Sequence, residues 1–485
     1  MSFISISKDM FDIAFTENGD KAYSTSGSYC LDYFSLIGGM RFNYDDALKN
    51  FMKAYKENPI LAIKILFFAR DIKEGLGERN IFRFTFNALC NMAPEVAKQV
   101  ISYVPTYGRY DDLFSAYSTP VRKEMMKIVK EQLYKDIEAK KENKPISLLA
   151  KWMPSINTSS YETRVLAQKL ASSLGMSKEE YRKTLSSLRK GIIVENNLRE
   201  KDYTFSYDAL PGGAMFKYRN AFLSNDNERY NKYLENLSLG KAKMNANTIY
   251  PYEVIRRFEK GVREEEVSSL DAIWNSFDRS AIDSKTIVVR DGSYSMYDYN
   301  SVSAHSVATS LAILFAEQLT GEFKNKFITF SMNPKIVEVK GKTIQEKYEC
   351  LTRYDEAANT DIGKVYKLIL RTYKHKDFKK EDAIDRIVII SDMEFDQCVE
   401  DASVSTFEYF KKEFENIGYD MPEVVFWNVR ARDVHFPVMN EFGVKLVSGA
   451  SAKIISMVTN NESKNAYDFM IECLEKYSCF DKIKI

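Results

Sequence analysis

An aspartate and two serines alternate in the stretch VVRDGSYSM, residues 288–296, directly after a run of valines. In a loop that stays extended, alternate side chains point to the same side, so Asp291, Ser293 and Ser295 share one face. One carboxylate and two hydroxyls make a partial set of hard oxygen ligands, which suits Mg²⁺ or another divalent cation. Taken alone, the pentapeptide is better explained as a loop whose Asp and Ser side chains cap the next helix.

Two further segments place oxygen ligands near this loop in the expected fold. Thr360 in AANTDIG directly precedes a predicted helix, where its hydroxyl is either an N-cap or a ligand from a second loop. Asp392 ends the buried run RIVIISD. Parallel α/β sheets bind ligands beyond the carboxyl ends of their strands, where the winding changes direction. The sequence therefore predicts a divalent-cation site formed by residues of three loops: Asp291, Ser293, Ser295, Thr360 and Asp392.

A hydrolase active site is the competing interpretation of these carboxylates. Phosphatases of the haloacid dehalogenase type need a second aspartate two residues after the first, where this chain has Ser293. The GKT at 341–343 lacks the glycine of a phosphate-binding loop five positions earlier, where Ile336 stands. The three histidines are far apart in sequence, so a serine–histidine triad is poorly supplied. We expect a protein that is not an enzyme, with Asp361 and Glu394 as the candidates for catalysis if it were one.

The elements that position these residues change character near residue 284. Residues 45–275 have apolar positions at three- and four-residue spacing between short Gly or Pro breaks, which predicts helix pairs in a HEAT-like repeat array. After 284, buried strand patterns alternate with helical ones, which predicts a doubly wound, Rossmann-like α/β sheet. We therefore expect a multidomain protein with an all-α domain at 1–280 and an α/β domain at 281–485.

Composition narrows the class of protein. The 485 residues are 45% hydrophobic and 28% charged, which is typical of a soluble globular chain. The net charge of +1 supplies no overall field for nucleic acid or anionic membrane, so any nucleic-acid surface must be a local patch. No apolar run is long enough to span a bilayer, and six scattered cysteines indicate free thiols. We expect a cytoplasmic protein without a membrane partner.

The DGSYS loop, the threonine of NTDIG and the aspartate of IISDM resemble the three parts of the metal-ion-dependent adhesion site of von Willebrand factor A domains. The resemblance implies that Ser293 and Ser295 bind Mg²⁺ directly and that a protein partner supplies a carboxylate to the open position. It implies that the aspartates act mainly through water. Arg290 and Tyr294 depart from the usual pattern, and the bulk of Tyr294 would narrow the approach to the metal.

The helical half resembles the TROVE module, the ring-forming helical-repeat domain of Ro autoantigen-type proteins, and more closely a related bacterial and phage family. The stretches that carry this resemblance are FARDIKEGLGERNIFR (68–83), YVPTYGRYDDLF (103–114), LAKWMPSINTSS (149–160), EEYRKTLSSLRKGIIVENNL (179–198), LPGGAMFKYRNAF (210–222) and NTIYPYEVI (247–255). The resemblance implies a ribonucleoprotein that binds non-coding RNA on a basic face and threads single-stranded ends through the ring.

Two basic clusters are candidates for contacts with RNA, because basic side chains neutralise phosphates and aromatic rings stack on unpaired bases. They contain Arg182, Lys183, Arg189, Lys190, Lys217 and Arg219. Solvated helix faces explain such clusters equally well. Trp152 and Trp274 are expected to be packing anchors. Two hypotheses remain: a non-enzymatic RNA-binding scaffold whose A-type domain closes the ring or recruits a partner, and a metal-dependent protein–protein adaptor without RNA.

Overall fold

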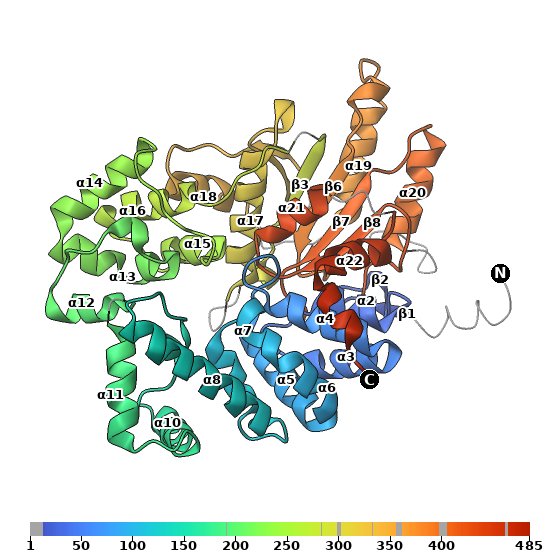
Figure 1. The fold of residues 1–485 in the computed structure, drawn as a ribbon. Helices are drawn as coiled ribbons and strands as arrows, with labels where there is room; N and C mark the ends of the chain where they lie inside the picture. Colours follow the sequence, from blue (N-terminus) through green and yellow to red (C-terminus); the bar gives the residue numbers. More distant parts are fainter. Residues whose placement is uncertain are drawn as a thin grey trace.

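A helical half and a half built on one sheet make up the chain in its computed structural model (Figure 1). The structure describes residues 13–190, 192–282, 284–297, 302–331, 333–355, 361–396, 405–460 and 464–485. The helical half contains α2 (Tyr29–Leu36), α3 (Tyr44–Glu57), α4 (Pro59–Arg70), α5 (Arg79–Met92), α6 (Pro94–Val100), α7 (Val104–Tyr107), α8 (Arg122–Lys141), α9 (Leu149–Trp152), α10 (Tyr161–Ser173), α11 (Lys178–Arg189), α12 (Val194–Glu200), α13 (Gly212–Asn225), α14 (Asn227–Ser238), α15 (Pro251–Glu259) and α16 (Glu264–Asn275).

Local sequence signals explain where these helices begin and which face they bury. Asn58 caps α4, its side chain accepting from the Leu61 N–H, and Pro59 occupies the first turn, where its missing N–H costs nothing. In α3 the buried positions include Ala47, Phe51 and Ala54, which follow the helical period. The predicted helix-rich character of this half is confirmed, and the division into HEAT-like repeats stays a prediction.

The second half is a mixed α/β fold around six strands. The strands are β3 (Thr286–Asp291), β4 (Lys326–Phe330), β5 (Ile336–Glu338), β6 (Arg386–Ser391), β7 (Glu423–Asn428) and β8 (Val444–Ser448). The helices of this half are α17 (Ala304–Gln318), α18 (Ile344–Thr352), α19 (Ile362–Tyr373), α20 (Thr406–Asn416), α21 (Lys453–Asn460) and α22 (Ala466–Leu474), followed by the 3-10 segment η7 (Glu475–Lys482). β3 and β6 coincide with the apolar runs that lead into Asp291 and Asp392 in the sequence.

The strand order β5-β4-β3-β6-β7-β8 places the first strand of the sheet in the middle. The chain winds from β3 out to β4 and β5, then returns to β6 and winds to β8 on the other side. All neighbours are parallel except β5, which is antiparallel to β4 at the edge. The winding therefore changes direction between β3 and β6, so ligand-binding loops are expected beyond the carboxyl ends of these two strands.

The N-terminal segment lies at that same carboxyl edge, which the sequence pattern does not indicate. A short hairpin of β1 (Ile13–Phe15) and β2 (Lys21–Tyr23) precedes α2. The end of α2 contacts β8 so closely that a Cβ on Gly38 would lie 2.5 Å from the Ser448 carbonyl oxygen. The Gly38 N–H donates to the Ser448 Oγ at 2.9 Å. The segment from β1 to the end of α2 therefore covers part of the sheet edge.

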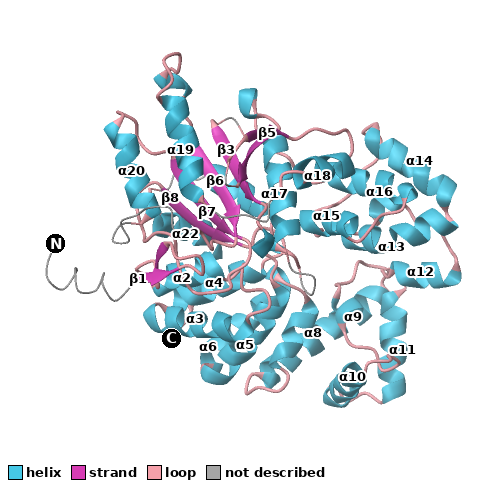
Figure 2. Ribbon diagram, turned by 180° about the vertical axis from the view of Figure 1, so that it is seen from behind, coloured by secondary structure: helices cyan, strands magenta, loops and turns pink. Residues whose placement is uncertain are grey.

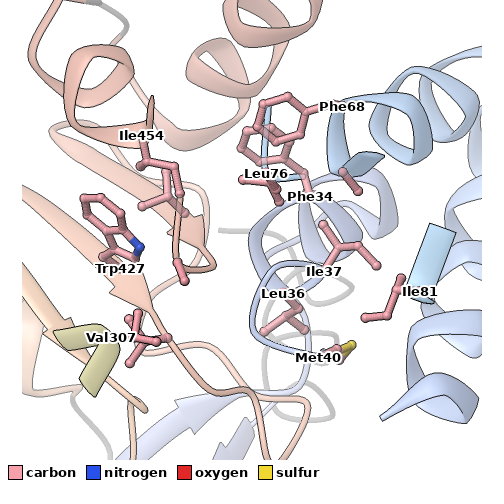
Figure 3. Packing of buried hydrophobic residues seen from close by; sticks show 14 of the residues in the cluster. Phe34, Leu36, Ile37, Met40, Phe68, Leu76, Ile81, Val307, Trp427 and Ile454 are labelled. Atoms are coloured by element: carbon pink, nitrogen blue, oxygen red, sulfur yellow. The ribbon is translucent and has the colours of Figure 1, made fainter. Parts of the chain in front are cut away.

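One hydrophobic core runs through both halves, with a satellite core around α13, α14 and α16. Figure 3 shows Leu36 and Ile37 on the helical side, and Trp427 and Ile454 on the side of the sheet, within this continuous cluster. The C-terminal helix α22 and η7 lie against α4 (Figure 2). The last elements of the chain therefore pack on the first helices. Among the described residues, no helix has both the length and the apolar content needed to cross a membrane.

Candidate functional site

The two predicted aspartates lie side by side at the point where the winding of the sheet changes direction. Asp291 is the last residue of β3, Asp392 directly follows β6, and both side chains are buried. Asp291 accepts hydrogen bonds from the Ser391 Oγ at 2.6 Å and from the Ser293 N–H at 2.9 Å. The Oγ atoms of Ser293 and Ser295 are 2.9 Å apart. These four predicted ligands are therefore brought together, and Thr360 lies outside the described residues.

The electrostatics of this edge favour a positive charge. Burial, together with the neighbouring carboxylate of Asp392, raises the pKa of Asp291 to about 6. Two buried carboxylates beside two hydroxyls are a hard donor set, so the residues present fit a divalent cation such as Mg²⁺. No group of three or more His, Cys, Asp or Glu with metal-binding geometry occurs among the described residues. The predicted ligands include only two residues of these types, Asp291 and Asp392, and the cation site stays a prediction.

The side chains of Asp361 and Glu394, the alternative candidates for catalysis, have structural contacts. Asp361 caps α19, because its Oδ1 accepts the Lys364 N–H at 3.1 Å. Burial raises the pKa of Glu394, and the Oε2 of this residue accepts the Glu17 N–H at 2.8 Å. Glu394 therefore anchors the turn between β1 and β2 to the sheet edge.

The predicted RNA contacts separate into exposed and structural side chains. Arg182, Lys183 and Lys190 are exposed, and Lys183 pairs with Glu179 one turn earlier in α11. Arg189 instead donates to the carbonyl oxygens of Ala150 and Met153 and to the Ser155 Oγ, at 2.6–2.8 Å. This half-buried side chain binds the end of α9, so Arg189 has a structural role, and its contact with RNA stays a prediction.

The side chain of Arg219 is more deeply buried than that of Arg189. Its side chain is buried, its Nη2 lies 3.0 Å from the Glu266 Oε2, and its Nη1 donates to the Phe216 carbonyl oxygen. A buried, paired guanidinium cannot contact phosphate at a surface. Its neighbour Lys217 remains exposed, with its Nζ 3.9 Å from the Glu195 Oε1. Spacing along α13 alone did not distinguish these two residues.

A cavity of about 940 Å³ lies between the helical array and the α/β half. Its lining comes from four stretches of the helical half, at 70–110, 148–152, 192–218 and 246–251, and from the later residues 277–282, Gln318 and 451–460. This volume is at the upper end of the range for ligand cavities, roughly 300–1,000 Å³. The cavity is therefore a site that both halves build.

Most of the charged side chains in this lining are basic, and the lining also contains aromatic rings. The basic residues are Arg70, Arg79, Arg109, Lys151, Lys217 and Lys453, against the acidic Glu195 and Asp278. Arg70 and Arg109 pair with Asp112 and Asp111, respectively. Arg79, Lys151 and Lys453 have no carboxylate in ion-pair contact within the part of the chain that the structure describes. Burial, followed by the guanidinium groups of Arg109 and Arg83, lowers the pKa of Arg79.

Trp152 is one of the aromatic residues in this lining, and two of the cations lie against its ring. The Arg109 guanidinium stacks 3.6 Å from the centre of the Trp152 ring, and the Lys151 Nζ lies 5.3 Å from it. Trp152 is partly exposed, unlike Trp274, which is buried and donates from its Nε1 to Glu317. The expectation of a packing anchor therefore holds for Trp274, whereas Trp152 faces the cavity. An aromatic ring flanked by cations suits a base next to a phosphate.

Sequence reasoning from charge clusters missed most of the cavity residues. Of the six predicted RNA contacts, only Lys217 lines it. The signal that could have found the others is the set of stretches that resemble TROVE: 68–83, 103–114, 149–160, 179–198, 210–222 and 247–255 all contribute to the lining. These segments are far apart in sequence, and only the folded chain brings them to one place.

Two family models match consecutive parts of the chain, and both describe domains of unknown function: DUF2828 at 16–105 and 123–285, and DUF7788 at 285–477. The chain is 30% identical over 517 residues to the uncharacterized protein L728 of Acanthamoeba polyphaga mimivirus, covering 96% of this chain and 88% of that protein. The crystal structure of the Deinococcus radiodurans Ro (RSR) protein is similar over 91% of this chain and 92% of that chain, with 10% identity and a TM-score of 0.34. A TM-score this low carries no argument about ligand or mechanism.

Proposed function

This chain belongs to the DUF2828 family, and we propose that it is a scaffold that binds single-stranded RNA in the cavity between its two halves without catalysing a reaction. The observation that carries the proposal is the cavity wall, which contains Trp152 together with Arg79, Lys151 and Lys453, three cations without a carboxylate in ion-pair contact among the described residues. Unpaired cations in a concave site attract a polyanion, and the aromatic ring gives an unpaired base a surface on which to stack.

The shape of the site favours a single strand over a duplex. The wall consists of side chains from many short segments, and no single long helix or strand is available to enter a groove. Single-stranded nucleic acid is bound by a positive channel with stacking platforms, in a manner tolerant of sequence. The same chemistry predicts weak sequence preference and strong dependence on salt. An unpaired segment of RNA is therefore the expected ligand, and the resemblance to TROVE proteins favours a non-coding RNA as its source.

In this proposal the second half is a von Willebrand factor A-like domain with a Mg²⁺ site. Asp291, Ser293 and Ser295 lie where the cation would be held, with Asp392 beside them and Thr360 as the expected ligand from the third loop. A bound Mg²⁺ would supply positive charge for a carboxylate, from a protein partner or from this chain. The alternative function is a metal-dependent protein–protein adaptor in which the cavity holds an acidic peptide instead of RNA.

Binding of a fluorescent single-stranded oligoribonucleotide, measured by anisotropy at several salt concentrations, tests the proposal. The test variant combines Lys151→Glu with Lys453→Glu, and the matched control combines Arg182→Glu with Lys183→Glu on the exposed face of α11. We expect the cavity variant to bind at least about tenfold more weakly, with a salt slope about 0.7 smaller for each phosphate that is no longer neutralised. The control should bind like the wild type.

An equal decrease in both variants would place the RNA on the outer surface and contradict the cavity site. Absence of RNA binding by the wild-type chain would contradict the proposal and favour the adaptor. An acidic peptide that binds the wild type, but not the variant with the same two cavity substitutions, would support that second function.

A further inference from the structure

We infer that Arg432 forms an ion pair with Asp392 when no divalent cation is bound, and that this ion pair lowers the affinity of the sheet edge for a divalent cation. This inference rests on the proposed cation site at Asp291, Ser293 and Ser295, and goes beyond it by naming the residue that opposes cation binding. Nothing in the usual three-part loop pattern includes a residue from this later loop.

The geometry places one guanidinium between two carboxylates. Arg432 follows β7, and its Nη2 lies 2.6 Å from the Asp392 Oδ2. Its Nη1 lies 3.1 Å from the Glu17 Oε2, in the turn between β1 and β2. The Asp392 side chain is 0% exposed, whereas the side chains of Arg432 and Glu17 are 25% and 49% exposed. Arg432 thus joins a buried carboxylate of the site to a solvated one outside it.

The turn that carries Glu17 is fastened to the loop after β6. The Thr16 Oγ1 donates to the Phe395 carbonyl oxygen at 2.6 Å, and the Asn18 Nδ2 donates to the Glu394 carbonyl oxygen at 2.8 Å. These contacts do not involve Arg432. Because the turn is held independently, Glu17 stays within reach of Arg432 when the guanidinium moves away from Asp392. Arg432 therefore has a carboxylate partner both when it contacts Asp392 and when a cation has displaced it.

Competition follows from the charges. Asp392 is the charged neighbour that acts most strongly on the buried Asp291, and among the described residues Arg432 is the cation paired with Asp392. The guanidinium cancels a negative charge that would otherwise attract Mg²⁺, and it repels the metal directly. A divalent cation must displace or outweigh it. Removal of this positive charge should therefore strengthen cation binding, the opposite of what removal of a ligand does.

Isothermal titration of the full chain with Mg²⁺, and separately with Mn²⁺, tests the inference. We expect Arg432→Gln to bind the cation about tenfold more tightly than the wild type, because a unit charge at short range in a partly buried site has at least this effect. Arg432→Lys keeps the charge and should stay close to the wild type. Arg386→Gln is the matched control, because Arg386 pairs with Glu423 at the start of β6, at the opposite end of the strand that Asp392 follows.

The outcomes separate this inference from the cation site itself. Cation binding that Asp291→Asn abolishes and that Arg432→Gln leaves unchanged or weakens would retain the site and overturn the role of Arg432. Equal tightening in Arg386→Gln would reduce the effect to net charge and also overturn it. Absence of binding in every variant, Arg432→Gln included, would overturn both.

Glu17→Gln gives a second route if Arg432→Gln does not fold. Removal of the exposed carboxylate takes away the alternative partner, so Arg432 should hold Asp392 more firmly and cation affinity should fall. Unchanged affinity in Glu17→Gln would contradict the proposed exchange of partners.

Discussion

Arg219 shows how its surroundings, rather than its type, determine what a basic residue does. In the sequence it stands beside Lys217 and Tyr218 and resembles part of an exposed RNA-binding cluster. In the fold its side chain is only 5% exposed and pairs with Glu266, whose side chain is 4% exposed. Glu266 also contacts Arg263 and Arg257. The pair therefore joins α13 to α16 from inside, and among the described residues only Glu266 is in ion-pair contact with further charged groups.

This asymmetry predicts unequal costs for the two alanine substitutions. Glu266→Ala leaves the buried Arg219 without its carboxylate and should lower the free energy of unfolding by about 3–5 kcal/mol. Arg219→Ala should cost less, because Glu266 keeps two other arginines. Urea denaturation followed by circular dichroism measures both. Glu264→Ala, at an exposed position of the same helix, is the control and should change stability by less than about 0.5 kcal/mol. Equal costs for the two test variants would contradict the asymmetry.

At the scale of elements, the contact between α2 and β8 sets how the helical half meets the sheet. Gly38 follows α2, and its main chain touches the main chain of Ser448 and Gly449. Any side chain at this position would separate the two elements. The hydrogen bond from the Gly38 N–H to the Ser448 Oγ links the two elements at this contact. Glycine is therefore required here by the distance between two backbones.

We expect Gly38→Ala to destabilise the protein by about 1–3 kcal/mol, because its Cβ would lie 2.5 Å from a carbonyl oxygen that cannot rotate away. Thermal unfolding measures the effect. Gly213→Ala, in the first turn of α13, is the matched control: the nearest atom to its Cβ is 3.8 Å away, so we expect no decrease in stability. A decrease in Gly213→Ala as large as in Gly38→Ala would show that glycine flexibility, not contact distance, matters.

At the scale of the whole molecule, the C-terminal segment returns to the first helices. The Phe480 ring centre lies 4.5 Å from that of Phe67 in α4, and the Tyr477 hydroxyl donates to the buried Asp71 carboxylate at 2.8 Å. These contacts join residues about 400 positions apart. Because the cavity needs both halves in place, this closure helps to hold the cavity wall together.

Phe480→Ala should therefore destabilise helices that lie far from residue 480 in sequence. We expect a destabilisation of about 3–5 kcal/mol, the usual cost of deleting a buried aromatic side chain, together with faster amide hydrogen exchange in α4 and α5. Hydrogen exchange followed by mass spectrometry measures this spread. Ile485→Ala, at a side chain that is 64% exposed, is the control and should leave exchange unchanged. Faster exchange confined to 466–482 would mean that the closure does not stabilise the helical half.

The sequence by itself determined many of the helices after residue 45 and the carboxyl ends of β3 and β6. Periodic apolar positions predict α3, α5 and α8, and buried runs predict β3 and β6 with Asp291 and Asp392 at their carboxyl ends. These signals are local, because the period of a helix or strand is written in consecutive residues. The adjacency of the two aspartates then follows from the general topology of parallel sheets.

Only the tertiary structure decided which charged side chains are buried, paired or free. It buried Arg219, bound the half-buried Arg189 to the end of α9, brought Arg79, Trp152 and Lys453 to one cavity, and joined Glu17 to Asp392 through Arg432. The residues of these contacts come from segments tens to hundreds of positions apart. Burial and charge pairing depend on such distant neighbours, so no local pattern in this sequence contains them.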